Sequence, residues 1–116
     1  MTPLIIAAAQ SISIAGDLAA NMVRHRSFMQ VAAEQGVQLL VFPELSLTGY
    51  ERGFAAELAI SPDAEVLQPL RDFAREVGVT TVVGMPIRLS EDSPVLIGAL
   101  VSVSYTHLTL PTTPYV

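Results

Sequence analysis

The residue of this chain best suited to chemistry is Glu44, which follows an apolar run and a proline. Residues 39–42 are apolar and predict a buried strand. Pro43 is expected to end that strand, because proline lacks an amide donor and keeps the preceding residue extended. Ligands of open α/β sheets bind at the carboxyl ends of strands. A carboxylate at such a strand end is a candidate general base.

Four other residues have candidate roles around this carboxylate. Gly49 suits a turn that needs a positive φ. Tyr50 is a candidate substrate-binding residue, although packing of its ring under the loop is the favoured interpretation of this position alone. Asn21 is expected to hydrogen-bond a loop, because asparagine is a poor residue inside a helix. His25 is expected at the solvated surface of that helix and not in a metal site, since no second ligand stands four residues later.

The elements that would position these residues alternate between strand and helix patterns. Continuous apolar runs predict strands at residues 4–9, 37–42, 79–85 and 95–101, the first of them buried on both faces. Helices are predicted at residues 18–35 and from residues 61–63 to 77, ended by Gly36 and Gly78 respectively. Pro86 is expected to stop the third strand, and residues 88–94 are a polar loop. This order predicts an α/β fold with a largely buried sheet.

The chain divides into two parts at residue 101. Residues 1–101 are expected to form one partial domain. Residues 102–116 contain threonines and prolines but no charged side chain, and their apolar positions fit neither helical nor strand spacing. They are expected to form an irregular tail, and a non-native origin would explain its abrupt start.

Composition excludes several classes of protein. Eleven acidic residues stand against six arginines, giving a net charge of −5 without a basic stripe, so nucleic acid is not expected as a partner. The absence of cysteine excludes a disulfide framework. The apolar start is too short to cross a membrane and lacks the basic residues of a signal peptide, so a cytoplasmic protein without membrane contact is expected. The glycine spacing matches no nucleotide loop, and neither a metal nor another cofactor is expected.

Residues 42–50, Phe-Pro-Glu-Leu-Ser-Leu-Thr-Gly-Tyr, closely resemble the first catalytic motif of the nitrilase, or carbon–nitrogen hydrolase, superfamily. Flanking patterns also resemble the family. They are the strand end at residues 8–10, the Gly16–Asp17 pair with Asn21, the helix that ends at Gly36, and the strand at residues 82–86. The resemblance spans roughly residues 3–101, which makes it much more specific than an isolated short motif.

This resemblance implies the α-β-β-α sandwich of the family and a glutamate–lysine–cysteine triad. The cysteine would attack an amide or nitrile carbon, the glutamate would act as general base, and the lysine would stabilise the tetrahedral intermediate. Only Glu44 can be carried over, because the chain contains neither lysine nor cysteine. The string at residues 105–108 has the tyrosine and the His-Leu of the family's lysine motif without its lysine. The chain is therefore expected to be an inactive N-terminal fragment of a homo-oligomeric hydrolase that acts on a small amide or nitrile.

Two alternatives remain open at this point. A catalytically dead binding or interaction module on the same half-fold would explain the missing lysine and cysteine directly. A flavodoxin-like ligand-binding domain would share the α/β pattern, but the chain has no phosphate loop, and such a domain does not explain residues 42–50.

Overall fold

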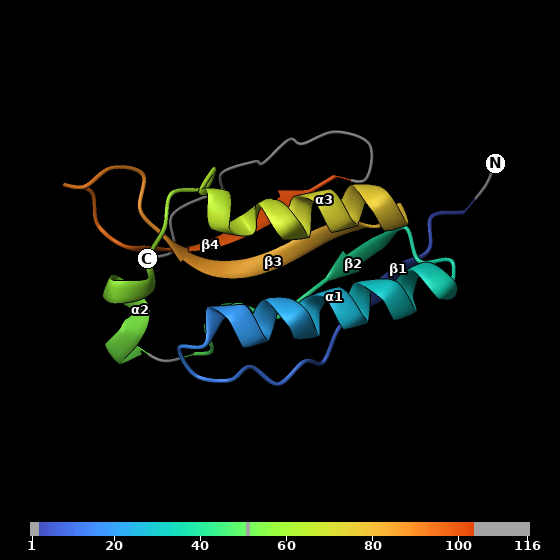
Figure 1. Ribbon diagram of the computed structural model, residues 1–116, viewed down its shortest axis with the longest axis horizontal. Helices are drawn as coiled ribbons and strands as arrows, with labels where there is room; N and C mark the ends of the chain where they lie inside the picture. Colours follow the sequence, from blue (N-terminus) through green and yellow to red (C-terminus); the bar gives the residue numbers. More distant parts are fainter. Residues whose placement is uncertain (1–2, 51, 104–116) are drawn as a thin grey trace.

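The computed structural model describes residues 3–50 and 52–103, which form one sheet with helices. In chain order the elements are β1 (Ile6–Ala8), α1 (Leu18–Glu34), β2 (Leu39–Val41), α2 (Arg52–Leu58), the 3-10 turn η1 (Glu65–Leu67), α3 (Gln68–Val77), β3 (Thr80–Ile87) and β4 (Leu96–Ser102). The predicted α/β class is confirmed (Figure 1). None of the helices in this described part has the length and hydrophobicity needed to cross a bilayer.

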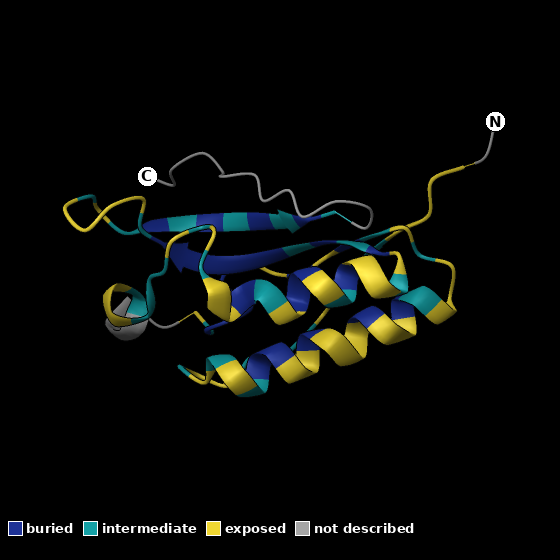
Figure 2. Ribbon diagram, turned by 45° about the horizontal axis from the view of Figure 1, so that its top comes forward, coloured by how far each residue is buried: buried dark blue, intermediate teal, exposed yellow. Residues whose placement is uncertain are grey.

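The sheet follows chain order, β1-β2-β3-β4. The first three strands are parallel, and β4 returns antiparallel to β3. Each helical connection joins neighbouring parallel strands, and right-handed crossovers of that kind put their helices on the same face of a sheet. Helices α1 and α3 accordingly lie side by side on one face (Figures 1 and 2).

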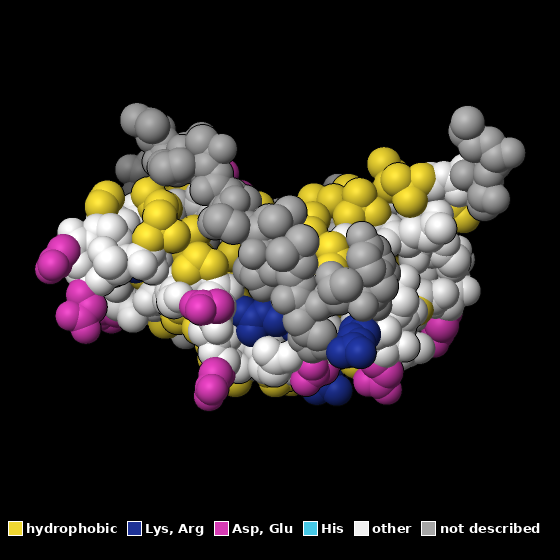
Figure 3. All heavy atoms as spheres, turned by 90° about the horizontal axis from the view of Figure 1, so that it is seen from above, with side chains coloured by type: hydrophobic (Ala, Val, Ile, Leu, Met, Phe, Trp, Pro, Cys, Tyr) yellow, Lys and Arg dark blue, Asp and Glu magenta, His cyan; other side chains and the backbone are white. Residues whose placement is uncertain are grey.

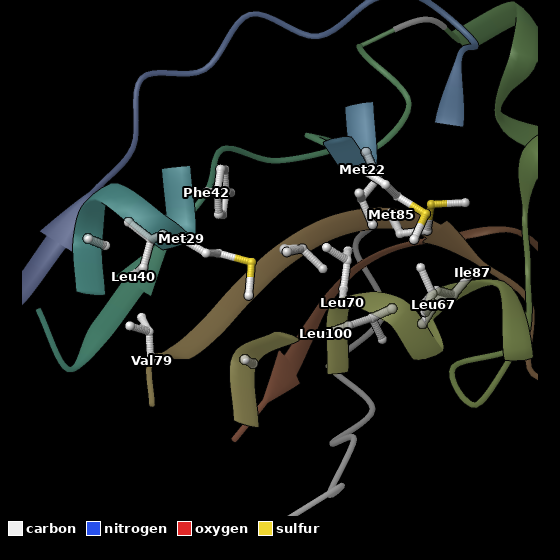
Figure 4. Close-up of a cluster of buried hydrophobic side chains, with 14 of the residues drawn as sticks. Met22, Met29, Leu40, Phe42, Leu67, Leu70, Val79, Met85, Ile87 and Leu100 are labelled. Carbon is white, nitrogen blue, oxygen red and sulfur yellow. The ribbon is translucent and has the colours of Figure 1, made fainter. Parts of the chain in front are cut away.

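The hydrophobic core lies between this face of the sheet and the two helices. Side chains from the sheet and from both helices meet there, as Figure 4 shows, among them Met29 of α1, Leu70 of α3 and Met85 of β3. Met29 and Met85 are fully buried. Met22 and Met29 of α1 lie in this core, and Leu18 and Ala33 of the same helix are partly buried and pack against it.

The opposite face of the sheet is open within the described residues. Ile6 is 63% exposed and Val41 is 39% exposed, although both are strand residues. In Figure 3 this face lies along the upper edge, where hydrophobic side chains gather, whereas charged side chains lie mostly at the left and along the lower edge. The prediction that the first strand is buried on both faces is thus wrong for this structure, because the described residues pack a layer on only one face.

Three predicted boundaries also need correction. Helix α2 lies between the second predicted strand and the second predicted helix, where no helix is predicted from the sequence. The segment after residues 61–63 first forms the turn η1, and α3 begins at Gln68 with Pro69 in its first turn. Strand β3 continues through Pro86 to Ile87. The carbonyl of Pro86 points away from β4 and accepts from the Ile60 amide, beyond the end of β2. The N–H and C=O of one strand residue point to the same side, so the N–H that proline lacks would not have bonded to β4. The proline is therefore tolerated inside β3.

Candidate active site

Glu44 lies where the chain leaves the sheet, as the sequence predicted. The amide of Phe42 still donates to the carbonyl of Val82 at 2.9 Å, and the chain then turns at Pro43, whose carbonyl accepts from the Ser46 amide. We call residues 43–49 the Glu44 loop. The Glu44 side chain is exposed and lines two hollows, one on each side of it.

The larger hollow, about 440 Å³, lies on the open face of the sheet. Residues of β2, β3 and β4 form its floor, among them Val41, Val82 and Ala99, and Pro43 and Glu44 lie at its rim. We call it the sheet hollow. Its floor consists of apolar side chains and backbone, so Glu44 is the ionisable group that the described residues supply to it.

The smaller hollow, about 260 Å³, lies between the Glu44 loop and the segment that follows β1. We call it the loop hollow. Ser11, Ser13 and Tyr50 line it together with Glu44. Tyr50 is 58% exposed, so the favoured interpretation that its ring packs under the loop is wrong. The Ser11 hydroxyl is buried there without a hydrogen-bond partner among the described residues.

Tight turns give the Glu44 loop its shape. The Ser46 amide donates to the Pro43 carbonyl at 3.1 Å, and the Gly49 amide donates to the Leu45 carbonyl at 2.8 Å. Gly49 has φ +87°, which confirms its predicted role. Leu45 has φ +54°, a conformation that non-glycine residues rarely adopt and that costs about 1 kcal/mol or more. Its side chain is 5% exposed, and this burial offsets the strain.

The loop lies directly on β3 at Gly84. A Cβ atom at this position would come 2.2 Å from the Leu45 nitrogen and 2.7 Å from the Pro43 oxygen. The Leu47 amide donates to the Gly84 carbonyl at 2.9 Å, which fixes the same contact. Only glycine allows the backbone to approach so closely. Gly84 therefore sets the height of the Glu44 loop above the sheet.

Asn21 braces the loop from the helix side. Its Oδ1 accepts from the Ile14 amide at 2.7 Å, and its Nδ2 donates to the carbonyls of Ile14 and Leu47 at 2.8 and 2.9 Å. The prediction that Asn21 hydrogen-bonds a loop is confirmed. Two further bonds tie the segment after β1 to the Glu44 loop, from the Ser13 hydroxyl to the Ser46 carbonyl and from the Gly16 amide to the Thr48 carbonyl.

His25 is buried, at 1% exposure, so its predicted place on the solvated surface is wrong. Its Nδ1 lies 2.7 Å from the Asn21 carbonyl and its Nε2 lies 2.8 Å from the Ser46 hydroxyl. The ring stacks on Phe42, with centroids 4.0 Å apart. Burial lowers the pKa of His25 below its usual value, and the bond to the Asn21 carbonyl offsets part of this effect. Its spacing could have revealed its burial, because His25 stands between the core positions Met22 and Met29.

Within the described residues, no cluster of three or more His, Asp or Glu side chains could hold a metal ion. The string at residues 105–108 lies outside them. The described part of the site therefore consists of Glu44, the loop that carries it and the two hollows.

Comparison with known proteins supports a single family. A family model described as carbon-nitrogen hydrolase matches residues 5–106. The NitN amidase from Nesterenkonia sp. AN1 superposes with a TM-score of 0.74 at 25% identity, over 97% of this chain and 43% of that protein. Another structure of this amidase, at 26% identity and a TM-score of 0.74 over 93% of this chain and 42% of that one, shows the Michael addition of acrylamide at its active-site cysteine.

A more distant protein has the same fold. A CN-hydrolase superfamily protein from Xanthomonas campestris has a TM-score of 0.80 at 20% identity, over 96% of this chain and 40% of that one. The chain thus spans about two-fifths of the length of these solved structures.

Proposed function

We propose that this chain, which belongs to the carbon–nitrogen hydrolase family, is the N-terminal part of an enzyme that hydrolyses non-peptide C–N bonds. The substrate would be a small amide, carbamoyl compound or nitrile. In this proposal Glu44 is the general base of a glutamate–lysine–cysteine triad, and the lysine and cysteine come from sequence that this chain does not contain.

The observation that carries the proposal is the position of Glu44 between two hollows. The carboxylate lies at the carboxyl end of β2 and at the rim of the sheet hollow. Its backbone is fixed by the contact with Gly84, so the base is positioned before any partner group arrives. A general base must lie within hydrogen-bond reach of the proton that it abstracts, and a fixed backbone supports that geometry.

In the proposed reaction Glu44 takes the proton of the cysteine thiol as the sulfur attacks the carbonyl carbon of an amide. The lysine stabilises the oxyanion of the tetrahedral intermediate, a contribution of about 3 kcal/mol by analogy with oxyanion-hole donors. The proton then leaves with the amine, and a thioester remains. Glu44 next deprotonates a water molecule that hydrolyses the thioester and regenerates the thiol.

Tyr50 is proposed to contact the substrate. Its ring lines the loop hollow beside Glu44 and is exposed, so it is available to a molecule bound there. The sheet hollow is proposed to receive the part of the enzyme that carries the nucleophile. The complete enzyme is expected to be a homo-oligomer, and we propose no metal or organic cofactor for it.

The 116-residue chain alone is proposed to be inactive, since it has no thiol to act as nucleophile. The same absence favours the second candidate function, a catalytically dead module that keeps the half-fold to bind a partner. Extending the reading frame in the source DNA separates the two. A lysine and then a cysteine in frame support the hydrolase, and a stop directly after residue 116 supports the binding module.

The decisive experiment expresses the complete reading frame and follows ammonia release from a panel of small amides and nitriles. Glu44→Gln should lower kcat by about 10²- to 10⁴-fold, the usual contribution of a general base. Glu57→Gln is a matched control, because Glu57 is an exposed glutamate of α2, and its kcat should stay within about twofold of wild type. Equal rates for Glu44→Gln and wild type would contradict the assignment of the base.

A further inference from the structure

We propose that Ser46 and His25 form a buried hydrogen-bond relay that holds the Glu44 loop on β3, which makes His25 a positioning residue for the general base. The relay runs from the Gly84 amide to the Ser46 hydroxyl, then to the His25 ring and on to the backbone of α1. It joins β3, the Glu44 loop and α1 in one chain of bonds. Its role in catalysis rests on the proposed function above.

The direction of each bond follows from the groups themselves. The Asn21 carbonyl can only accept, so the His25 Nδ1 must carry the proton and donate to it at 2.7 Å. The neutral ring then has a free lone pair on Nε2, which accepts from the Ser46 hydroxyl at 2.8 Å. The Ser46 oxygen in turn accepts from the Gly84 amide at 3.1 Å. Each ring nitrogen and the hydroxyl of this relay therefore has a partner of the matching kind.

Burial makes these bonds strong determinants of position. Ser46 and His25 are each 1% exposed, so neither can exchange its partner for bulk water. A buried polar group that loses its partner costs about 1–3 kcal/mol, which discourages any shift of the loop. The stack on Phe42 fixes the plane of the ring, and thereby the direction in which Nε2 points.

The relay acts close to the base in sequence and in space. Ser46 is two residues after Glu44, and the strained residue Leu45 lies between them. Gly84, which supplies the first donor of the relay, also contacts the backbone of Pro43 and Leu45 on both sides of Glu44. Loss of the relay would allow the loop to lift from the sheet, and displacement of a catalytic group by about 1 Å can cost up to 10²-fold in rate.

The first test measures kcat and KM in the complete enzyme. Ser46→Ala and His25→Phe should each lower kcat about tenfold per correctly folded active site and change KM by less than about twofold. The phenylalanine keeps the stack on Phe42 and removes both hydrogen bonds. The double variant should be no worse than either single variant, because both substitutions break the same relay. His25→Gln, whose amide oxygen can accept from Ser46, should recover part of kcat.

Controls separate positioning from simple stability. Ser27→Ala removes an α1 hydroxyl that donates to the Val23 carbonyl at 3.2 Å on the exposed side, and it should leave kcat unchanged. A substitution that only weakens folding lowers the melting temperature and the number of active sites without lowering kcat per site. Unchanged kcat per site in Ser46→Ala and His25→Phe, or independent tenfold losses that multiply in the double variant, would overturn the proposal.

A second measurement does not depend on activity. Nitrogen-15 NMR of histidine-labelled enzyme, with the His25 signal identified by its loss in His25→Gln, should show a neutral ring protonated on Nδ1. A ring protonated on Nε2 would overturn the relay. If the wild-type enzyme hydrolyses none of the test substrates while His25 has the expected tautomer, the proposed function fails and the relay geometry stands.

Discussion

The two faces of the sheet differ sharply, although the same strands form both. On the side of α1 and α3, Val83 and Leu100 are 4% and 2% exposed. On the other side, Ile6 and Val41 are 63% and 39% exposed, and their surroundings are apolar. One face is thus a finished core, whereas the other has the composition of a core without a layer of described residues on it. One covered and one open sheet face are expected of a chain that builds one helix layer and one sheet of an α-β-β-α sandwich.

The site lies at the boundary between these two faces. The Glu44 loop is tied to α1 on the covered side through Asn21 and His25, and to β3 through Gly84. The Glu44 carboxylate itself lies at the rim of the sheet hollow, on the open face. The described residues therefore hold the Glu44 loop in place, and under the proposed function the remaining groups of the site would come from the open side.

The largest effect is expected at Gly84, where the loop touches β3. In Gly84→Ala the new Cβ would meet backbone atoms of Leu45 and Pro43, which cannot move as a flexible side chain could. The free energy of unfolding should fall by about 4 kcal/mol, because the loop must lift and its buried bonds must break. Urea unfolding followed by circular dichroism measures the change.

Gly78→Ala is the matched control for this prediction. Gly78 has φ +75°, and a Cβ added there would meet no described atom within 4 Å, so only backbone strain opposes the substitution. That strain should cost about 1 kcal/mol. If the two alanine variants lost the same stability, the close contact between the Glu44 loop and β3 would not be what Gly84 provides.

A smaller effect is expected from two adjacent valines of β3 that point to opposite faces. Val83→Ala removes methyl groups from the finished core and should cost about 2 kcal/mol. Val82→Ala acts on the open face, where Val82 lines the sheet hollow, and should cost less than about 1 kcal/mol in this chain. Both positions lose the same β-propensity, so the difference reports burial alone. Urea midpoints at constant m-value provide the measurement.

The same pair sharpens the comparison when it is measured in the complete enzyme. A second sheet packed on the open face would bury Val82 as well, and the two costs should then converge. Equal costs already in the 116-residue chain would contradict the open face seen here.

The sequence predicted the parts of the fold that depend on local patterns. Apolar runs located β2 and β4, and Gly78 ended α3 as expected, with φ +75°. Boundaries that depend on tertiary contacts were missed. Pro86 does not stop β3, because its carbonyl pairs with Ile60 at a point where β2 has already ended. Exposure of the first strand was also missed, since an apolar run has the same sequence whether or not a layer covers it.

For the site, the sequence located Glu44 at a strand end and Asn21 as a loop brace, because proline and a polar residue inside a helix are local signals. It did not identify the roles of His25 and Gly84. His25 stands between two arginines, and these charged neighbours hid its place on the buried stripe. The need for glycine at residue 84 arises from a loop about forty residues earlier, and no local pattern reveals such a contact.

The smallest effect is expected in the pH dependence of stability, through His25, a buried residue of α1. Burial holds the folded-state pKa of His25 below the ordinary value of 6.5, so below that pH the unfolded chain binds a proton that the folded chain resists. The stability from the neutral ring is therefore fully present above pH 6.5 and is lost as the pH falls toward the folded-state pKa. Its partners, the Asn21 carbonyl and the Ser46 hydroxyl, do not titrate in this range. Urea unfolding between about pH 7.5 and 5 should show the decline, and His25→Gln should remove it. If the free energy of unfolding depended on pH in the same way in wild type and His25→Gln, burial of the His25 ring would be contradicted.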